Sequence, residues 1–251
     1  MKIWAYAICW NEAKILPYYL RHYSQFCEKI IIYDNGSDDG SQEIIKSHPK
    51  AVLRHYDTSG QIKDDVYLQI KNNCWKESRG KADWVIVGDI DELVYHPNII
   101  DFLAFNGSQH SVFNPAGMNM IADKFPTTSG QIYEEVQRGS FHPGSCKPML
   151  FDPNRVAEIN FDPGGHTANR KKITGKLWLW RNHHGDPFRS PIKVLHFKFM
   201  GLNYVTNRYR QLANRLSESN KKRGWGSHYL KGNTGVISEF KQIKQSSKQV
   251  I

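Results

Sequence analysis

Several motifs that would assign a chain to a class at once are missing from this sequence. It has no Gly-x-Gly-x-x-Gly run and no phosphate-loop Lys, which argues against dinucleotide-binding and ATPase classes. Its four cysteines include no Cys-x-x-Cys pair and are widely spaced, at Cys9, Cys27, Cys74 and Cys146. Neither a zinc cluster nor a disulfide framework is therefore indicated, and buried free thiols in a reducing compartment fit best.

Long apolar runs are also missing. None approaches the roughly 20 apolar residues needed to cross a bilayer. The residues from Met1 to Trp4 lead into a strand-like segment without a signal-peptide pattern. We therefore expect a cytoplasmic protein, and peripheral contact with a membrane stays open.

The charge is unevenly distributed over the 251 residues. Residues 1–100 contain 12 Lys and Arg against 14 Asp and Glu, whereas residues 101–251 contain 22 against 10. The overall formal charge of +10 therefore belongs to the second half. Such asymmetry suggests an anionic partner: phosphate, an anionic glycan, a membrane surface or nucleic acid. A solvated basic surface explains it as well.

The first hundred residues alternate short apolar runs with helical patterns, as βαβ units do. The expected strands are 3–8, 29–33, 51–56 and 84–87, with helices at 17–26, 41–46 and 64–78. The fold class is therefore α/β, with a Rossmann-like, mostly parallel central sheet flanked by helices. The chain is long enough, and at 39% apolar residues hydrophobic enough, to form the buried core of one such domain.

The pattern changes after about residue 105. Residues 106–144 are rich in Gly, Asn, Ser, Thr and Pro, and strand-like runs at 112–114, 148–151, 176–180 and 193–199 lie between long loops. Loops of this length usually build a binding surface. We expect residues 1–105 to bind a nucleotide, residues 106–230 to form an irregular acceptor-binding half of the same domain, and residues 231–251 to be a polar tail or linker.

Three acidic residues follow the fourth strand directly, at Asp89, Asp91 and Glu92. In extended backbone Asp89 and Asp91 point to the same side, and Ile90 points away. Ligands of open parallel sheets bind beyond the carboxyl ends of the strands. Carboxylates there suit Mg²⁺ or Mn²⁺ held together with phosphate oxygens. The alternative is that these carboxylates only cap a following helix.

Polar loops also follow the first two strands, at residues 9–12 and 34–41. The acid that ends the second strand of a doubly wound sheet typically accepts hydrogen bonds from ribose hydroxyls. Asp34 has this position, from which it could accept either from a ribose or from the imide N-H of a base. Turn formation alone also explains the Asn35-Gly36 and Asp39-Gly40 pairs.

These segments together resemble the GT-A glycosyltransferases, particularly the family 2-like group. The residues that carry the resemblance are Trp10-Asn11-Glu12, the run from Tyr33 to Ser41, Asp83-Trp84-Val85 and the run from Asp89 to Leu93. The resemblance covers roughly residues 3–95. It implies a domain that binds a nucleoside diphosphate sugar, often a UDP-sugar, with manganese or magnesium.

The resemblance also implies roles for individual residues. Glu12 and Asp34 would contact the nucleoside, and Asp89 and Asp91 the ribose, diphosphate and metal. The segment 194–201 looks like the late strand whose His, here His196, completes the metal shell, although a strand His is also often a core residue. The expected metal ligands are thus Asp89, Asp91 and His196. The expected nucleotide-sugar contacts are Trp10, Asn11, Glu12, Asp34, Asn35, Asp89, Ile90, Lys147, His166 and Lys198.

The expected reaction is transfer of a sugar to a hydroxyl of a glycan or other acceptor, and the family 2 resemblance favours inversion. Such a reaction needs a general base, for which Asp162, Asp186 and Glu135 are candidates, with Asp162 preferred because it precedes the Gly164-Gly165-His166 loop. Lys147, Lys198 or Arg208 would offset the charge of the leaving diphosphate.

Two other functions compete with this one. A sugar-phosphate nucleotidyltransferase of similar fold should have a Gly-rich, basic loop after the first strand, which residues 10–12 do not provide. A nucleic-acid-binding module accounts for the basic charge but leaves the carboxylates at Asp89 and Asp91 unexplained.

Overall fold

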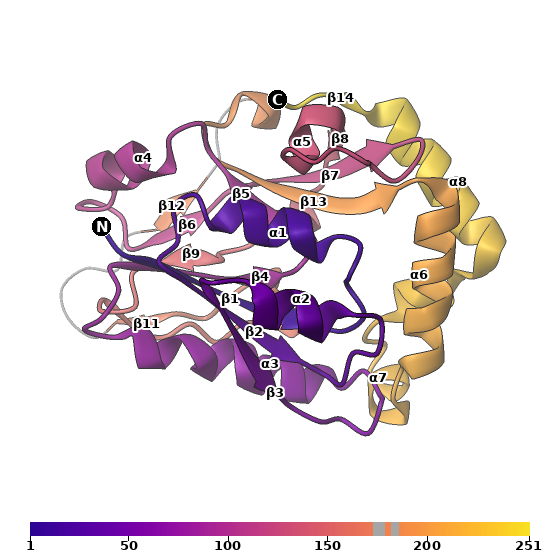
Figure 1. Cartoon of the computed structure of the whole chain (residues 1–251). Helices are drawn as coiled ribbons and strands as arrows, with labels where there is room; N and C mark the ends of the chain where they lie inside the picture. The colour runs from indigo at the N-terminus through magenta and orange to yellow at the C-terminus, as the bar shows by residue number, and fades with distance from the viewer. Residues whose placement is uncertain (173–178, 182–185) are drawn as a thin grey trace.

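A seven-stranded sheet forms the centre of the molecule (Figure 1). The structure is a computed structural model that describes residues 1–172, 179–181 and 186–251. The order of the strands in the sheet is β12-β6-β9-β4-β1-β2-β3. In chain order these strands are β1 Ile3–Cys9, β2 Lys29–Asp34, β3 Ala51–His55, β4 Trp84–Asp89, β6 Val112–Asn114, β9 Leu150–Phe151 and β12 Leu179–Arg181.

The first four strands confirm the predicted parallel sheet. Strand β1 pairs in parallel with β2 and β4, and β2 with β3. Ile30 and Ile32 face the cluster that contains α1 Leu16–Tyr23 and α2 Ser41–Ser47, whereas Ile31 faces the opposite cluster, next to α3 Asp64–Asn73. Because successive strand residues point to opposite faces, this run is buried on both sides. The fold is therefore α/β and Rossmann-like, as expected.

A second sheet has five strands. Its order is β14-β8-β7-β13-β5. Its strands are β5 Glu92–Tyr95, β7 Ala116–Ala122, β8 Arg138–Phe141, β13 Lys193–Met200 and β14 Lys248–Gln249. Only Ile90 and Asp91 separate β4 from β5, so the chain passes from one sheet into the other at the predicted metal motif.

The remaining elements are short, apart from two helices. Strands β10 Val156–Glu158 and β11 Lys171–Lys172 form a two-stranded sheet. The other helices are α4 Ile99–Asn106, α5 Ile132–Glu135, α6 Leu202–Arg215, α7 Glu218–Lys222 and α8 Gly232–Ser246. Helices α6 and α8 pack against each other at one end of the molecule (Figure 1).

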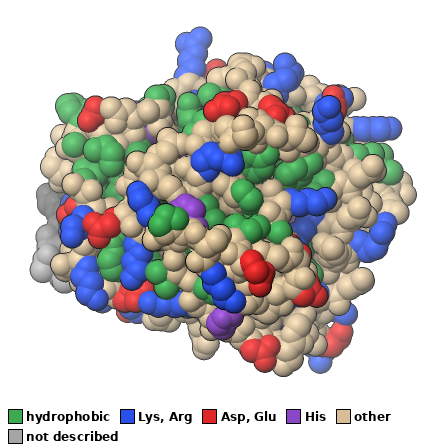
Figure 2. Space-filling view, viewed as in Figure 1, with side chains coloured by type: hydrophobic (Ala, Val, Ile, Leu, Met, Phe, Trp, Pro, Cys, Tyr) green, Lys and Arg blue, Asp and Glu red, His purple; other side chains and the backbone are tan. Residues whose placement is uncertain are grey.

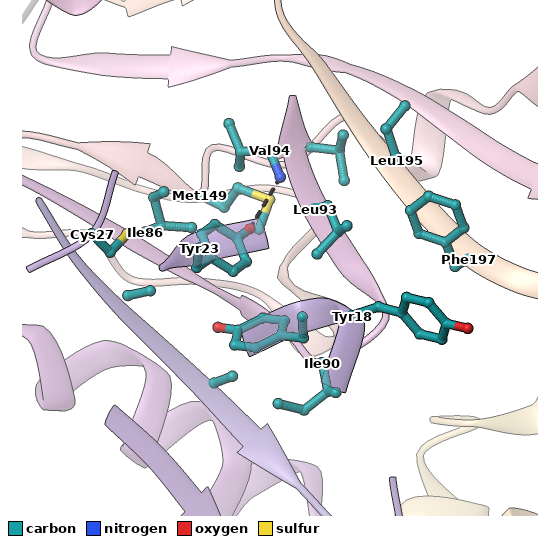
Figure 3. Close-up of a cluster of buried hydrophobic side chains, with 14 of the residues drawn as sticks. Tyr18, Tyr23, Cys27, Ile86, Ile90, Leu93, Val94, Met149, Leu195 and Phe197 are labelled. Atoms are coloured by element: carbon teal, nitrogen blue, oxygen red, sulfur yellow. Dashed lines mark hydrogen bonds between the residues drawn. The ribbon is translucent and has the colours of Figure 1, made fainter. Parts of the chain in front are cut away.

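Helix α1 packs its aromatic side chains against β5 (Figure 3). The Tyr23 hydroxyl donates to the carbonyl of Glu92 and accepts from the amide of Val94, at 3.0 Å each. His22 lies with Nε2 2.9 Å from the Val94 carbonyl. Burial lowers the pKa of His22 to about 4, so its ring is neutral near pH 7 and Nε2 donates this bond.

Several predicted boundaries differ from the structure. Helix α1 ends at Tyr23 and not at residue 26, and α3 ends at Asn73, where a 3-10 helix, Cys74–Ser78, continues the chain. The predicted strand at 176–180 falls mostly on residues 173–178, outside the described residues, and β12 covers 179–181. The two predicted halves share the main sheet, because β6, β9 and β12 join it from the second half.

The segment 231–251 was expected to be a polar tail or linker, but it folds as α8 and β14. Val236 and Phe240 are buried in a cluster with Phe199, Val205 and Tyr209. In α8 the apolar residues Val236, Phe240 and Ile243 recur at a helical spacing. The many Lys, Gln and Ser residues around them obscure this pattern in the sequence.

No described helix is long and apolar enough to cross a membrane. On the face shown in Figure 2, Lys and Arg side chains lie in several separate places among acidic and neutral side chains.

Docking of α8 can be tested with two Phe→Ala substitutions of opposite burial. Phe240 is 6% exposed, whereas Phe105 is 80% exposed. We expect Phe240→Ala to lower the free energy of unfolding by about 3–5 kcal/mol, because it leaves a cavity. The control Phe105→Ala should change it by less than about 0.5 kcal/mol. Urea denaturation measures both, and equal losses would mean that α8 is not part of the core.

Candidate active site

The predicted carboxylates lie where β4 ends and the chain turns into the second sheet. Asp89 is the last residue of β4, and its side chain is 36% exposed. Its Oδ1 lies 2.7 Å from Lys71 Nζ, and its Oδ2 lies 3.6 Å from Lys147 Nζ. Burial alone would raise the pKa of Asp89, but Lys71 and Lys147 outweigh it and hold the pKa below its usual value. Asp89 is therefore an ionised carboxylate held by two cations.

The structure brings Asp91 and His196, two of the expected metal ligands, side by side. Strand β13 pairs antiparallel with β5, so that His196 stands opposite Glu92 and the amide of Phe197 donates to the Asp91 carbonyl at 2.8 Å. The side chains follow this register, and His196 Nε2 lies 3.2 Å from Asp91 Oδ2. Burial opposes ionisation of Asp91, but His196 outweighs it and lowers the pKa of this carboxyl.

The tautomer of His196 follows from its other ring nitrogen. Nδ1 lies 3.1 Å from Asn119 Oδ1, an acceptor, which also receives a hydrogen bond from the Ser145 hydroxyl at 3.1 Å. Nδ1 therefore donates, and in a neutral ring Nε2 presents a lone pair to the Asp91 carboxylate. Either a proton on Nε2 or a cation between the two atoms removes this repulsion.

The donor atoms of Asp91 and His196 fit two neighbouring ligands of one divalent ion. Ligands about 2.1 Å from an octahedral ion lie about 3 Å from one another, close to the separation seen. Within the described ranges no group of three or more His, Cys, Asp or Glu side chains could hold a metal by itself. Asp89 is engaged by its lysines. Two protein ligands with substrate phosphate oxygens thus match the site better than three protein ligands.

Lys147 joins Asp89 to a buried acid. Its Nζ lies 2.5 Å from Glu92 Oε1, and the side chains of Lys147 and Glu92 are 9% and 1% exposed. Burial alone would lower the pKa of Lys147, but Glu92 and Asp89 outweigh it and raise the pKa. Lys147 is therefore positively charged. It forms a close ion pair with Glu92 and lies next to Asp89.

The loop after β1 is tied to helix α6. Arg208 donates to the carbonyls of Trp10 and Asn11 at 3.0 and 3.1 Å and to the carboxyl of Glu12. Burial raises the pKa of Glu12 to about 8, although Arg208 acts in the opposite direction. Arg208 was predicted to offset the charge of the leaving diphosphate. In the structure its guanidinium instead binds Glu12 and the backbone of the loop after β1, because α6 lies against that loop.

The loop after β2 is internally bonded. Asp34 is fully buried, and both its carboxylate oxygens accept hydrogen bonds from Ser37. Asn35 is also buried and donates to Thr58 at 2.8 Å. Asn11, at a φ of 51°, exchanges side-chain hydrogen bonds with Asp38. Contact of Asp34 with a ribose would therefore require the residues that bury it to move.

The other predicted residues are spread around this site. Ile90 is 2% exposed and points into the core, as its place between two outward carboxylates requires. Lys198 lies two residues after His196, with Nζ 5.0 Å from the centre of the Tyr209 ring. Asp162 and His166 are both exposed; Asp162 accepts from Thr167, and His166 Nδ1 contacts the Gly144 carbonyl.

Sequence reasoning did not identify Lys71 or Tyr229. Lys71 lies on α3, 18 residues before Asp89, and nothing in its spacing connects the two. Burial raises the pKa of Tyr229, and the nearby charges of Asp91 and Asp89 add to that rise. The 3-10 helix that contains it, Ser227–Lys231, packs on α6, far along the chain from β4.

The comparisons give distant relatives. No family model matches the chain. A stretch of 98 residues is 32% identical to a glycosyltransferase family 92 protein of Arabidopsis thaliana and covers 35% of this chain and 15% of that protein. A second glycosyltransferase family 92 protein, of Ricinus communis, is 22% identical over 212 residues, 74% of this chain and 36% of that protein. Both relatives are glycosyltransferases by name. The chain spans well under two thirds of either.

Solved structures resemble the chain only in part. A 4-diphosphocytidyl-2C-methyl-D-erythritol synthase matches with a TM-score of 0.34 and 14% identity, over 61% of this chain and 76% of that one. Protein A197 from STIV matches with a TM-score of 0.35 and 10% identity, over 78% of this chain and 86% of that one.

Removal of the Lys147 charge tests whether the buried pair is structural. Lys147→Met leaves the Glu92 carboxylate buried without its cation, which should cost about 3–5 kcal/mol of unfolding free energy. The double variant with Glu92→Leu should recover most of that loss, because the pair is then replaced by apolar groups.

Lys244→Met is the matched control for this experiment, since Lys244 is paired with Asp123 at the surface. It should change stability by less than about 1 kcal/mol. A loss no larger in Lys147→Met than in this control, measured by urea denaturation, would show that Lys147 does not hold Glu92 in the folded state.

Proposed function

We propose that this chain is a metal-dependent glycosyltransferase that moves a sugar from a nucleoside diphosphate sugar, in the first place a UDP-sugar, to a hydroxyl of a glycan or similar acceptor. The observation that carries the proposal is the contact of Asp91 with His196, 3.2 Å apart, next to the ionised Asp89 at the carboxyl end of β4. The two family 92 relatives support the reaction class. The GT-A family 2-like motifs support the donor class and inversion at the anomeric carbon.

The donor set favours Mn²⁺ or Mg²⁺ at Asp91 and His196, because carboxylate oxygen and imidazole nitrogen both suit Mn²⁺ and the carboxylate suits Mg²⁺. When bound, such an ion supplies Lewis-acid stabilisation of the departing diphosphate. Lys71 and Lys147 keep Asp89 ionised next to it. Their positive charges also offset the negative charge of a diphosphate brought to this carboxylate.

The acceptor hydroxyl attacks the anomeric carbon, and the bond from that carbon to the diphosphate oxygen breaks. The hydroxyl proton passes to a general base, for which we propose Asp162. Its exposed position at the loop before Gly165 and His166 keeps it accessible to an acceptor. The other acids considered, Asp186 and Glu135, are also exposed, and Asp162 is preferred because it precedes the Gly164-Gly165-His166 loop.

Metal-dependent binding of a nucleotide is the first test. We expect UDP to bind with Mn²⁺ present and to lose more than about tenfold in affinity in Asp91→Asn, which removes one ligand of the ion. Calorimetry with UDP, GDP and dTDP, with and without Mn²⁺, measures this. Asp101→Asn, an exposed acid on α4, is the control and should bind like the native chain. Absence of nucleotide binding with any metal, or salt-dependent nucleic-acid binding that survives EDTA, would contradict the proposal.

The role of Asp162 is tested by turnover. Asp162→Asn should lower the release of UDP from a UDP-sugar in the presence of acceptor by about 10²–10⁴-fold, the range for loss of a general base. Its affinity for UDP should stay unchanged, because Asp162 is not expected to contact the nucleotide. Asp186→Asn is the comparison and should turn over normally. Unchanged turnover in Asp162→Asn removes Asp162 as the base.

A further inference from the structure

Arg215 is a buried cation whose two terminal nitrogens have no hydrogen-bond partner. It is the last residue of α6 and is 8% exposed. Its Nε donates to the Gly60 carbonyl at 2.8 Å. Nη1 and Nη2 are buried, and neither has a hydrogen-bond partner among the described residues. Such donors cost free energy unless something accepts from them, so the arrangement points to a ligand.

The backbone around Arg215 is held in place. Its carbonyl accepts from the amide of Ile62 at 2.6 Å, and the amide of Ser217 donates to the Ile62 carbonyl at 3.2 Å. The end of α6 is thus paired with the loop that follows β3. Arg215 is thus anchored through its backbone and through its side-chain Nε. Its two Nη donors therefore point in a defined direction.

Aromatic side chains surround the guanidinium. Its central carbon lies 3.5 Å from the centre of the Trp10 ring. The Tyr56 and Tyr67 rings, 6.0 Å apart and edge to face, also lie near, and the Tyr56 hydroxyl is buried without a hydrogen-bond partner too. Stacking on the indole stabilises the charge. It leaves the donors unsatisfied, because they point along the plane of the guanidinium and not across it.

The location separates this group from the diphosphate end of the site. Lys71 and Lys147 lie at Asp89, where β4 ends. Arg215 lies instead between the loops that follow β1 and β3, near Asp34 at the end of β2. In a doubly wound sheet that side receives the nucleoside. A planar base with carbonyl oxygens offers in-plane acceptors to an Arg fork, whereas adenine has no carbonyl group.

We propose that Arg215 is a specificity residue that donates its Nη hydrogen bonds to a carbonyl oxygen of the nucleobase, so that the site accepts uracil and discriminates against adenine. The inference rests on the proposed function and adds the residue that selects the base. Both Nη atoms are covered in this structure, so the proposal requires the side chains that cover them to move when the base enters.

The experiment compares affinities for UDP and ADP in the presence of Mn²⁺, by calorimetry on the full chain. In the native chain UDP should bind at least about fivefold more tightly than ADP, the lower end of what one bidentate base contact provides. Arg215→Met should weaken UDP binding by about the same factor and leave ADP binding unchanged. Arg215→Lys keeps the charge without the fork and should also lose discrimination.

Arg210→Met is the matched control, an exposed Arg on the same helix, and should bind both nucleotides like the native chain. Circular dichroism establishes that each variant is folded; if Arg215→Met does not fold, Arg215→Lys decides. Equal affinity of the native chain for UDP and ADP, or unchanged discrimination in the folded Arg215 variants, would overturn this inference alone. A native chain that binds neither nucleotide with Mn²⁺ contradicts the proposed function itself.

Discussion

The antiparallel pairing of β5 with β13 determines the geometry of the candidate site. Strand β4 belongs to the main sheet and β5 to the second one, with only Ile90 and Asp91 between them. Ile90 is anchored in the core, so Asp91 has little freedom. The amide of Phe197 holds the Asp91 carbonyl, and His196 then stands beside the Asp91 carboxylate. A shift of this register by one residue would turn His196 to the other face of its sheet.

The acids of the site are neutralised from different parts of the chain. Asp89 faces Lys71 of α3, Glu92 faces Lys147 of a loop, and Glu12 faces Arg208 of α6. Carboxylates gathered this closely in a partly buried place would repel one another without these cations. The basic excess of the second half of the chain is thus used in part within the molecule, since Lys147, His196 and Arg208 all come from it.

The parts of the fold and site that depend on local sequence could be predicted. The run from Ile30 to Ile32 identified the parallel sheet, and the acids after β4 identified the edge at which the candidate site is proposed, because period-two patterns and strand ends are local signals. The pairing of Lys71 with Asp89 and the orphaned donors of Arg215 could not be predicted, since both depend on contacts between distant segments. Helix α8 was missed because polar residues outnumber the few, such as Val236 and Phe240, that dock it.

Strand β5 lies at the edge of its sheet, with β13 on one side only. Exposed edge strands invite pairing with strands of other molecules and so promote aggregation. Here the Tyr23 hydroxyl takes up the Glu92 carbonyl and the Val94 amide, and His22 takes up the Val94 carbonyl. Two side chains of α1 therefore do for β5 what a further strand would do, and they take up the Glu92 carbonyl and both backbone groups of Val94, with which a foreign strand could otherwise pair.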